Sequence, residues 1–269
     1  MEDLLAHLAL LLVAGALAGF LAGLLGIGGG IVMTPVLFLV LGRLGVPESW
    51  HMHVTVATSL AVIVPTGLVS ARSHWRRGSA DTALLARWIP WVLPGAVAGA
   101  LVARSLASET LADVFGAVAA LLGVKMLLPL DDLRLGARIP RGIWTAAAPF
   151  LIAFVSAMMG IGGATFSVPY MTLFGMPIRR AVGTAAAIGA ALAMAGVASY
   201  VAGGWGHAEL APAAGYLGFV HLPAAAALAP AAMLAAPWGA RAAHALPHRA
   251  LSAVFGIFLL LAAARIAFA

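Results

Sequence analysis

Cysteine is absent from the 269 residues, which excludes disulfide bonds, thiol catalysis and thiolate metal sites. Charge is scarce as well, since Asp, Glu, Lys and Arg together make up 9% of the chain whereas 63% of the residues are hydrophobic. A water-soluble globule needs more polar surface than this composition supplies. The composition therefore indicates a membrane protein.

Several chemical classes have no signature here. The sequence has no zinc-protease His-Glu helix motif, no serine elbow and no pair of facing aspartates, so we expect neither an enzyme nor a bound metal or cofactor. The isoelectric point is near 11.0, but the 15 basic residues are scattered through short loops and helix ends. A nucleic-acid partner is therefore not expected.

Long apolar runs are what the chain does have. Residues 4–25 and 54–69 each approach the roughly 20 residues needed to cross a bilayer. The first run is too long for the apolar core of a signal peptide, and several comparable runs follow it. The 31 glycines and many alanines suit helices that pack closely inside a membrane. We expect a multi-pass protein whose surroundings are a lipid bilayer.

The chain repeats itself. Gly26-Ile27-Gly28-Gly29-Gly30 followed by Pro35 returns as Gly160-Ile161-Gly162-Gly163-Ala164 followed by Pro169, an offset of 134 residues. Residues 99–129 align without gaps onto 239–269 at an offset of 140. We therefore predict two membrane repeats, residues 1–130 and 142–269, joined by a polar linker at 131–141.

Each repeat is predicted to contain five helical elements, and the second of each five is short. Length alone leaves two alternatives for this short element: a broken helix that crosses, or a re-entrant segment. The predicted helices lie near residues 4–25, 31–43, 52–72, 82–104, 109–128, 142–159, 165–176, 179–203, 222–243 and 249–267.

The distribution of positive charge bears on how the repeats are oriented. Antiparallel repeats place twelve of the 15 basic residues on one side, and parallel repeats place nine there. Because basic loops stay in the cytoplasm, the charge favours antiparallel repeats. The predicted fold is an all-α polytopic membrane protein with two inverted repeats, an architecture in which transporters hold substrate near the midplane. The twelve are Arg72, Arg76, Arg77, Arg87, Lys125, Arg134, Arg138, Arg141, Arg179, Arg180, Arg241 and Arg249.

The glycine-rich breaks are the predicted binding site. A helix that restarts after such a break offers unpaired N–H groups and the positive end of its dipole, so two facing breaks would cradle an anion. Nearby hydroxyls add neutral donors, although they could equally bond to backbone carbonyls of their own helices. The predicted substrate-binding residues are Gly28, Gly29, Gly30, Thr34, Thr58, Ser59, Gly162, Gly163, Thr165, Ser167 and Thr184.

Two further pairs of residues occupy equivalent positions in the repeats. Lys125 and Arg265 occupy equivalent repeat positions and are possible secondary charge contacts, with snorkelling to the membrane surface as the alternative. Asp81 and His221 also occupy equivalent positions, each at the start of a predicted helix. Helix capping suits Asp81 better than catalysis does.

These motifs resemble the sulfite exporter TauE/SafE family over essentially the full chain. The resemblance implies transport of small sulfur-containing anions, such as sulfite or sulfoacetate, across the bacterial inner membrane, usually outward. Ala164 and Ala185 depart from Gly30 and Ser59 of the first repeat, so the second cradle has one hydroxyl fewer. The segments that carry the resemblance are 26–35, 160–169, 56–59, 182–185, 75–78 and 239–241.

The expected function is export of such an anion by alternating access. The alternatives are a passive anion channel, an uptake carrier for a related anion, and a membrane scaffold without transport. The expected partners are a small anionic substrate and the bilayer, and the sequence leaves the oligomeric state open.

Overall fold

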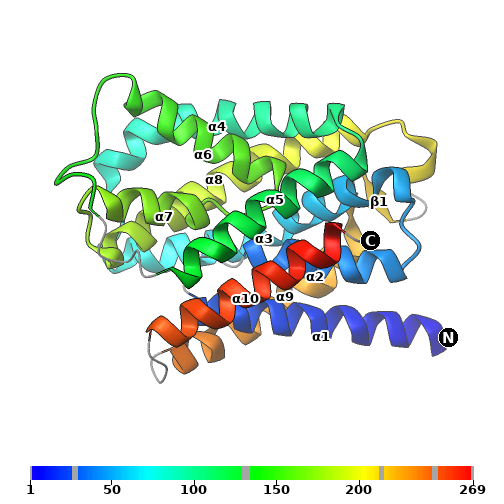
Figure 1. Ribbon diagram of the computed structural model, residues 1–269. Helices are drawn as coiled ribbons and strands as arrows, with labels where there is room; N and C mark the ends of the chain where they lie inside the picture. The colour runs from blue at the N-terminus through cyan, green and yellow to red at the C-terminus, as the bar shows by residue number, and fades with distance from the viewer. Residues whose placement is uncertain (1, 26–29, 129–133, 212–214, 244–247, 268–269) are drawn as a thin grey trace.

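A computed structural model describes residues 2–25, 30–128, 134–211, 215–243 and 248–267 (Figure 1). The first repeat contains α1 (Glu2–Leu25), α2 (Gly30–Arg43), the short 3-10 helix η1 (Glu48–Trp50), α3 (His51–Arg76), α4 (Thr82–Ser105) and α5 (Ser108–Leu127). The second contains α6 (Trp144–Met158), α7 (Ala164–Leu173), α8 (Ile178–Gly204), η2 (Ala208–Leu210), β1 (Tyr216–Leu217), β2 (Val220–His221), α9 (Leu222–Ala243) and α10 (His248–Ala267).

Every predicted helix is present, with ends that differ by a few residues. Six helices in the described chain are long and apolar enough to cross a membrane, so this is a multi-pass membrane protein. The all-α prediction missed the small antiparallel hairpin of β1 and β2, in which Tyr216 pairs with His221. Four residues are too few to show the alternation by which a strand is recognised.

The second helix of each repeat is short, as predicted. α2 has 14 residues and α7 has 10, so they are about 21 and 15 Å long at 1.5 Å per residue. A hydrocarbon core is ~30 Å thick, which neither helix can cross alone. α7 ends earlier than predicted because Gly175 adopts a left-handed φ of 81° and Pro177 precedes α8.

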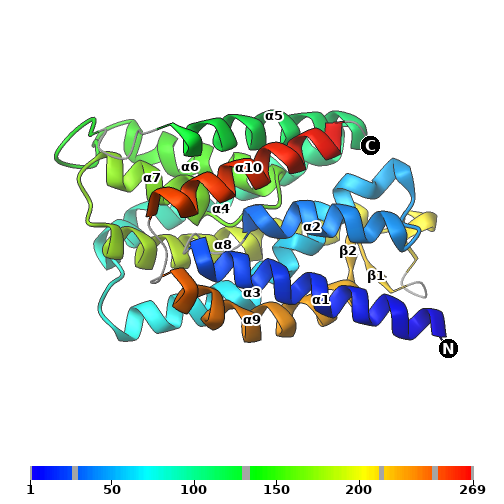
Figure 2. The same cartoon turned by 60° about the horizontal axis from the view of Figure 1, so that its bottom comes forward.

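Helix contacts follow the repeat. α1 packs on α9, and their repeat counterparts α6 and α4 pack on each other. α3 packs on its own counterpart α8, and α5 packs on its own counterpart α10. α3 and α8 have the largest buried shares among the long helices, which places them at the centre of the bundle. Figure 2 shows α1 and α9 side by side in the lower part of the view, and α5 and α10 together in the upper part.

Glycines set the closest of these contacts. Gly99 lies against the carbonyl of Phe154, and its repeat counterpart Gly239 lies against the carbonyl of Phe20. Gly123 and Gly256 lie against each other's carbonyl oxygens where α5 and α10 cross. A side chain at any of these positions would collide with backbone, so glycine is what lets the helices approach.

The bundle has two distinct ends. In both views α3, α5, α7 and α9 end on the left, where α4, α6, α8 and α10 begin (Figures 1 and 2). We call this the arginine-rich end, because Arg76 ends α3, Arg87 lies near the start of α4, Arg179 and Arg180 begin α8, and Arg241 lies in the last turn of α9. The hairpin β1–β2 lies at the opposite end, where both termini are also found.

Candidate functional site

The glycine-rich break of the second repeat lies directly against the start of α2. Gly30 is the first residue of α2, and a Cβ there would overlap the backbone nitrogen of Gly162. Gly28 and Gly29, two of the predicted site residues, lie outside the described residues. At Gly30 and Gly162, therefore, the two repeats meet backbone to backbone in the centre of the bundle.

Two hydroxyls of the first repeat hold this break in place. Gly160 has a left-handed φ of 66°, and its carbonyl oxygen accepts hydrogen bonds from Ser59 Oγ at 2.7 Å and Thr34 Oγ1 at 3.0 Å. Thr34 Oγ1 also lies 3.1 Å from the carbonyl oxygen of Met159. Both side chains are fully buried. Thr34 and Ser59, which the sequence analysis predicts to bind substrate, are thus hydrogen-bonded to the backbone of the other repeat.

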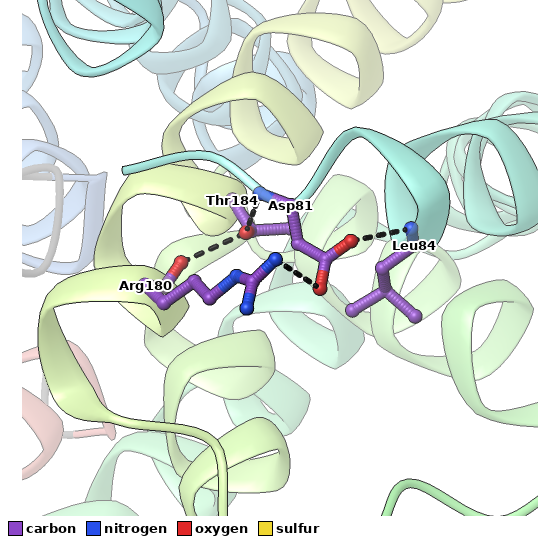
Figure 3. Close-up of polar contacts among 4 residues, drawn as sticks. All are labelled: Asp81, Leu84, Arg180 and Thr184. Carbon is purple, nitrogen blue, oxygen red and sulfur yellow. Dashed lines mark hydrogen bonds and ion pairs between the residues drawn. The ribbon is translucent and has the colours of Figure 1, made fainter. Parts of the chain in front are cut away.

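Thr58 and Thr184 form a matched pair of contacts with loops of the other repeat. The Asp81 N–H donates to Thr184 Oγ1 at 2.8 Å, and the His221 N–H donates to Thr58 Oγ1 at 3.0 Å. Thr184 Oγ1 in turn donates to the carbonyl of Arg180, one turn earlier in α8 (Figure 3). Both threonines are fully buried and already hydrogen-bonded within the protein.

Asp81 and His221 extend the same pattern by capping the helices that follow them. Asp81 Oδ1 accepts the Leu84 N–H at 3.0 Å and caps α4, as the sequence predicted (Figure 3). His221 Nδ1 accepts the Ala224 N–H at 3.2 Å and does the same for α9. Each first-turn N–H so satisfied would otherwise lack an intrahelical partner. Capping by the histidine had no sequence signal beyond its repeat position.

At the start of α7 one hydroxyl has no partner. Ser167 donates to the carbonyl of Gly163 within its own helix, which is the self-bonding alternative raised from the sequence. Thr165 is 6% exposed, and its Oγ1 has no hydrogen-bond partner among the described residues. A buried unpaired hydroxyl is costly and uncommon, so Thr165 is the predicted residue best placed to receive a ligand.

A cavity of about 450 Å³ reaches this break. Gly162, Gly163 and Ala164 line it at the start of α7. Met33 of α2 also lines it, and the other walls come from the parts of α1, α3, α8 and α9 that lie toward the arginine-rich end. Most of these residues are apolar. The cavity therefore lies between the repeats and extends from their centre toward the arginine-rich end.

One polar stripe faces this cavity, and sequence reasoning missed it. Thr66, Ser70, Ser73 and His74 of α3 all line the cavity. Their spacing of four, three and one residues places them on one face of a helix. The helical spacing of these polar residues is present in the sequence and could have indicated the stripe.

Aromatic rings close the opposite end. Phe219, in the turn between β1 and β2, is fully buried, with its ring centroid 5.3 Å from those of Trp50 and His53. Trp50 also lies 4.4 Å from His207. We call Trp50, His53, His207 and Phe219 the aromatic plug. Trp50 and His53 come from η1 and the first turn of α3, whereas His207 and Phe219 lie more than 150 residues later in the chain, so no sequence spacing indicated the cluster.

Lys125 and Arg265 do not join the site. Both are exposed, and neither lines the cavity. They lie in the last turns of α5 and α10, which run antiparallel, so they point to opposite ends of the bundle. The described residues also contain no group of three His, Cys, Asp or Glu side chains that could hold a metal ion.

Comparison with known proteins decides the family. The model of the sulfite exporter TauE/SafE family matches residues 11–266. The chain belongs to this family. The matched range includes the break between α6 and α7, whose Gly162 and Gly163 line the cavity.

Curated TauE/SafE relatives carry transporter names. A probable membrane transporter protein of Haemophilus influenzae is 34% identical over 254 residues, which cover 94% of this chain and 96% of the relative. The probable membrane transporter protein YunE of Bacillus subtilis is 28% identical over 72% of this chain and 78% of its own length. A probable membrane transporter protein of Methanocaldococcus jannaschii is 25% identical over 74% of each chain. No solved structure matches.

This TauE/SafE protein is accordingly a multi-pass membrane transporter. The family and the relatives' names point to transport and not to an enzyme.

Proposed function

We propose that this protein is a secondary transporter that exports a small sulfur-containing anion, sulfite or an organosulfonate such as sulfoacetate, across the bacterial inner membrane by alternating access. The observation that carries the proposal is the cavity that ends at Gly162, Gly163 and Ala164 at the start of α7. The next residue in the chain is Thr165, whose buried hydroxyl has no hydrogen-bond partner among the described residues. A helix N-terminus and a free hydroxyl together suit an oxyanion. Membership of the TauE/SafE family supports the substrate class.

Binding near the start of α7 needs no fixed charge. The described cavity lining includes no Arg, Lys, Asp or Glu, and His74 is its one titratable side chain. Neutral donors hold an anion weakly enough to release it, which suits a carrier. We propose Gly162, Gly163 and Thr165 as the inner contacts, and Ser70 and Ser73 as contacts along the path from the arginine-rich end.

Two inverted repeats, residues 1–130 and 142–269 with 131–141 as linker, supply the alternating access that we propose. Contacts of Gly67 with Ala190 and of Gly196 with Leu60 show that α3 and α8 run antiparallel, and the glycine contacts of α5 and α10 show the same for that pair. In inverted repeats, exchanging the conformations of the two halves moves the opening from one side of the membrane to the other. The arginine-rich end is then cytoplasmic.

The cavity on one side and the aromatic plug on the other favour a carrier over a channel, because a channel needs a continuous wet pore. We assign this arrangement to an inward-facing state. Outward movement of one negative charge is favoured by about 2.3 kcal/mol per 100 mV of inside-negative potential, so export requires no second energy source.

Flux into and out of proteoliposomes tests the proposal. Radiolabelled sulfite should exchange with saturable kinetics, compete with sulfoacetate, and respond to an imposed potential. Unsaturated flux with single-channel currents would support the passive channel instead. Uptake against the potential would support the uptake carrier. The absence of any flux would support a membrane scaffold without transport.

A single methyl group provides a matched pair of variants. Gly30→Ala places a Cβ on the backbone of Gly162 and should abolish exchange, because the two repeats can no longer meet there. Gly116→Ala also adds one methyl within a helix, but its nearest neighbour is the Ala263 carbonyl at an ordinary 3.6 Å. If both variants exchanged substrate at the same rate, the contact between Gly30 and Gly162 would have no role in transport.

A further inference from the structure

A second, basic cleft lies at the arginine-rich end, away from the cavity. Its volume is about 360 Å³, and it is formed by the start of α4, the linker, the turn between α7 and α8, and the start of α8. Four arginines and one carboxylate are among its described lining residues: Arg87, Arg138, Arg141, Arg180 and Asp81. No residue of this cleft lines the cavity that ends at α7.

The linker is docked against the second repeat, which keeps its arginines at the cleft. The N–H groups of Leu135 and Gly136 donate to the carbonyl oxygen of Leu173, at 2.8 and 3.3 Å. Gly175, in the left-handed region, lies against the carbonyl of Ala137. Arg138 and Arg141 follow directly in the chain. The cleft is thus a built feature that joins α4 of one repeat to α7 and α8 of the other.

Its charge is incompletely balanced by the described protein. Asp81 Oδ2 lies 3.5 Å from Arg180 Nη2, the one ion pair found among the described residues (Figure 3). The other oxygen of Asp81 caps α4. Asp81 therefore offsets at most one of the four guanidinium groups, which leaves an excess of three positive charges in a cleft. A guanidinium group can donate two parallel hydrogen bonds to two oxygens of one phosphate, in bidentate geometry.

The surroundings of the cleft are those of a membrane surface. Ile143 and Trp144, just after Arg141, are 79% and 54% exposed. Trp75, in the last turn of α3 at the same end of the bundle, is 59% exposed. Exposed tryptophans beside the ends of spanning helices mark the headgroup layer. A headgroup layer at these tryptophans would place the arginines at the height of lipid phosphates and the apolar side chains where acyl chains begin.

We propose that this cleft binds the headgroup phosphate of an anionic phospholipid, and that the bound lipid ties the first repeat to the second. Basic pockets between spanning helices on the cytoplasmic side are suited to such headgroups. The proposal concerns lipid binding alone and stands apart from the substrate and direction of transport.

Native mass spectrometry of the full-length protein in detergent tests this site. We expect phosphatidylglycerol to remain bound in preference to phosphatidylcholine. Each neutralised arginine should weaken phosphatidylglycerol binding about fivefold, so Arg87→Gln, Arg138→Gln and Arg141→Gln combined should weaken it roughly 100-fold. Arg43→Gln, which removes an exposed charge at the opposite end, is the control and should leave binding unchanged.

Thermal unfolding separates the sources of phosphate. Phosphatidylglycerol should raise the Tm of the wild type and of Arg43→Gln, but not of the triple variant, whose fold is checked by its circular dichroism and by its Tm without lipid. Single variants replace the triple variant if it does not fold. Equal affinity for both lipids, unchanged binding in the arginine variants, or an equal rise in Tm with inorganic phosphate would each overturn the proposal.

Discussion

Replacing Thr184 or Thr58 by valine tests whether these hydroxyls are structural. Valine keeps the shape of threonine and removes the oxygen that accepts the N–H of Asp81 at 2.8 Å or of His221 at 3.0 Å. An N–H left without an acceptor costs about 1–3 kcal/mol when it is buried. Asp81 and His221 are only half-buried, so water partly compensates and we expect about 1 kcal/mol for each variant.

That loss is measurable by thermal unfolding in detergent, followed by tryptophan fluorescence. Each variant should lower the Tm by about 2–4 °C, using the scaling for chains of this size. The two contacts lie in different loops, so the double variant should lower it by about 4–8 °C. Substrate affinity should be unchanged in all three proteins.

Thr55→Val is the matched control. Thr55 is a fully buried threonine of the same helix as Thr58, but its hydroxyl donates only to the carbonyl of His51, one turn earlier. Its removal leaves no N–H unpaired and should change the Tm by less than either test variant. If Thr58→Val and Thr184→Val matched this control in Tm but raised the KM for transport, the hydroxyls would serve the substrate and the structural reasoning would be wrong.

Three more outcomes follow from the fold. Burial lowers the pKa of His221 below its ordinary 6.5, so the unfolded chain takes up the proton at a higher pH than the folded chain does. The Tm should therefore decline as pH falls below about 6.5. His221→Asp should reduce this decline, which fluorescence melts at several pH values would measure. Gly99→Val drives a side chain into the Phe154 carbonyl and should cost folded yield in gel filtration, whereas Gly45→Asn, with its left-handed φ and open surroundings, should not. Arg179→Cys should react with a membrane-impermeant maleimide added to the cytoplasmic side, and Arg104→Cys should react with the same reagent added to the other side. The reverse labelling would refute the proposed topology.

The fold was largely predictable because its signals are local or repeated. Apolar runs bounded by Pro, Gly and charged residues predicted all ten α-helices, and the repeated glycine motif indicated the two halves. The hairpin β1–β2 and the aromatic plug were not predictable, since Trp50 and Phe219 meet only through the tertiary fold. A residue pattern carries no information on such a contact when no alignment shows the two positions varying together.

The meeting point of the two halves was predictable from the sequence, but the partners of the hydroxyls near it were not. The glycines do mark where the repeats meet, as Gly30 and Gly162 show. A hydroxyl near a break, however, can bond to protein or remain free, and only geometry distinguishes these outcomes. Ser59 and Thr165 illustrate the two cases: one donates to the Gly160 carbonyl, and the other has no partner in the described chain.

Where α5 crosses α10, the contact is isologous: Gly123 lies against Gly256, and their repeat counterparts Ala263 and Gly116 lie against each other. Such an interface needs no second gene to complete it. A half-length chain that inserted into the membrane in both orientations would find its partner in a copy of itself. In the inverted topology that we propose, joining two copies through the linker would fix the ratio of the orientations at one to one. It would also free each copy to specialise, and Ser59 and Ala185 differ at equivalent positions.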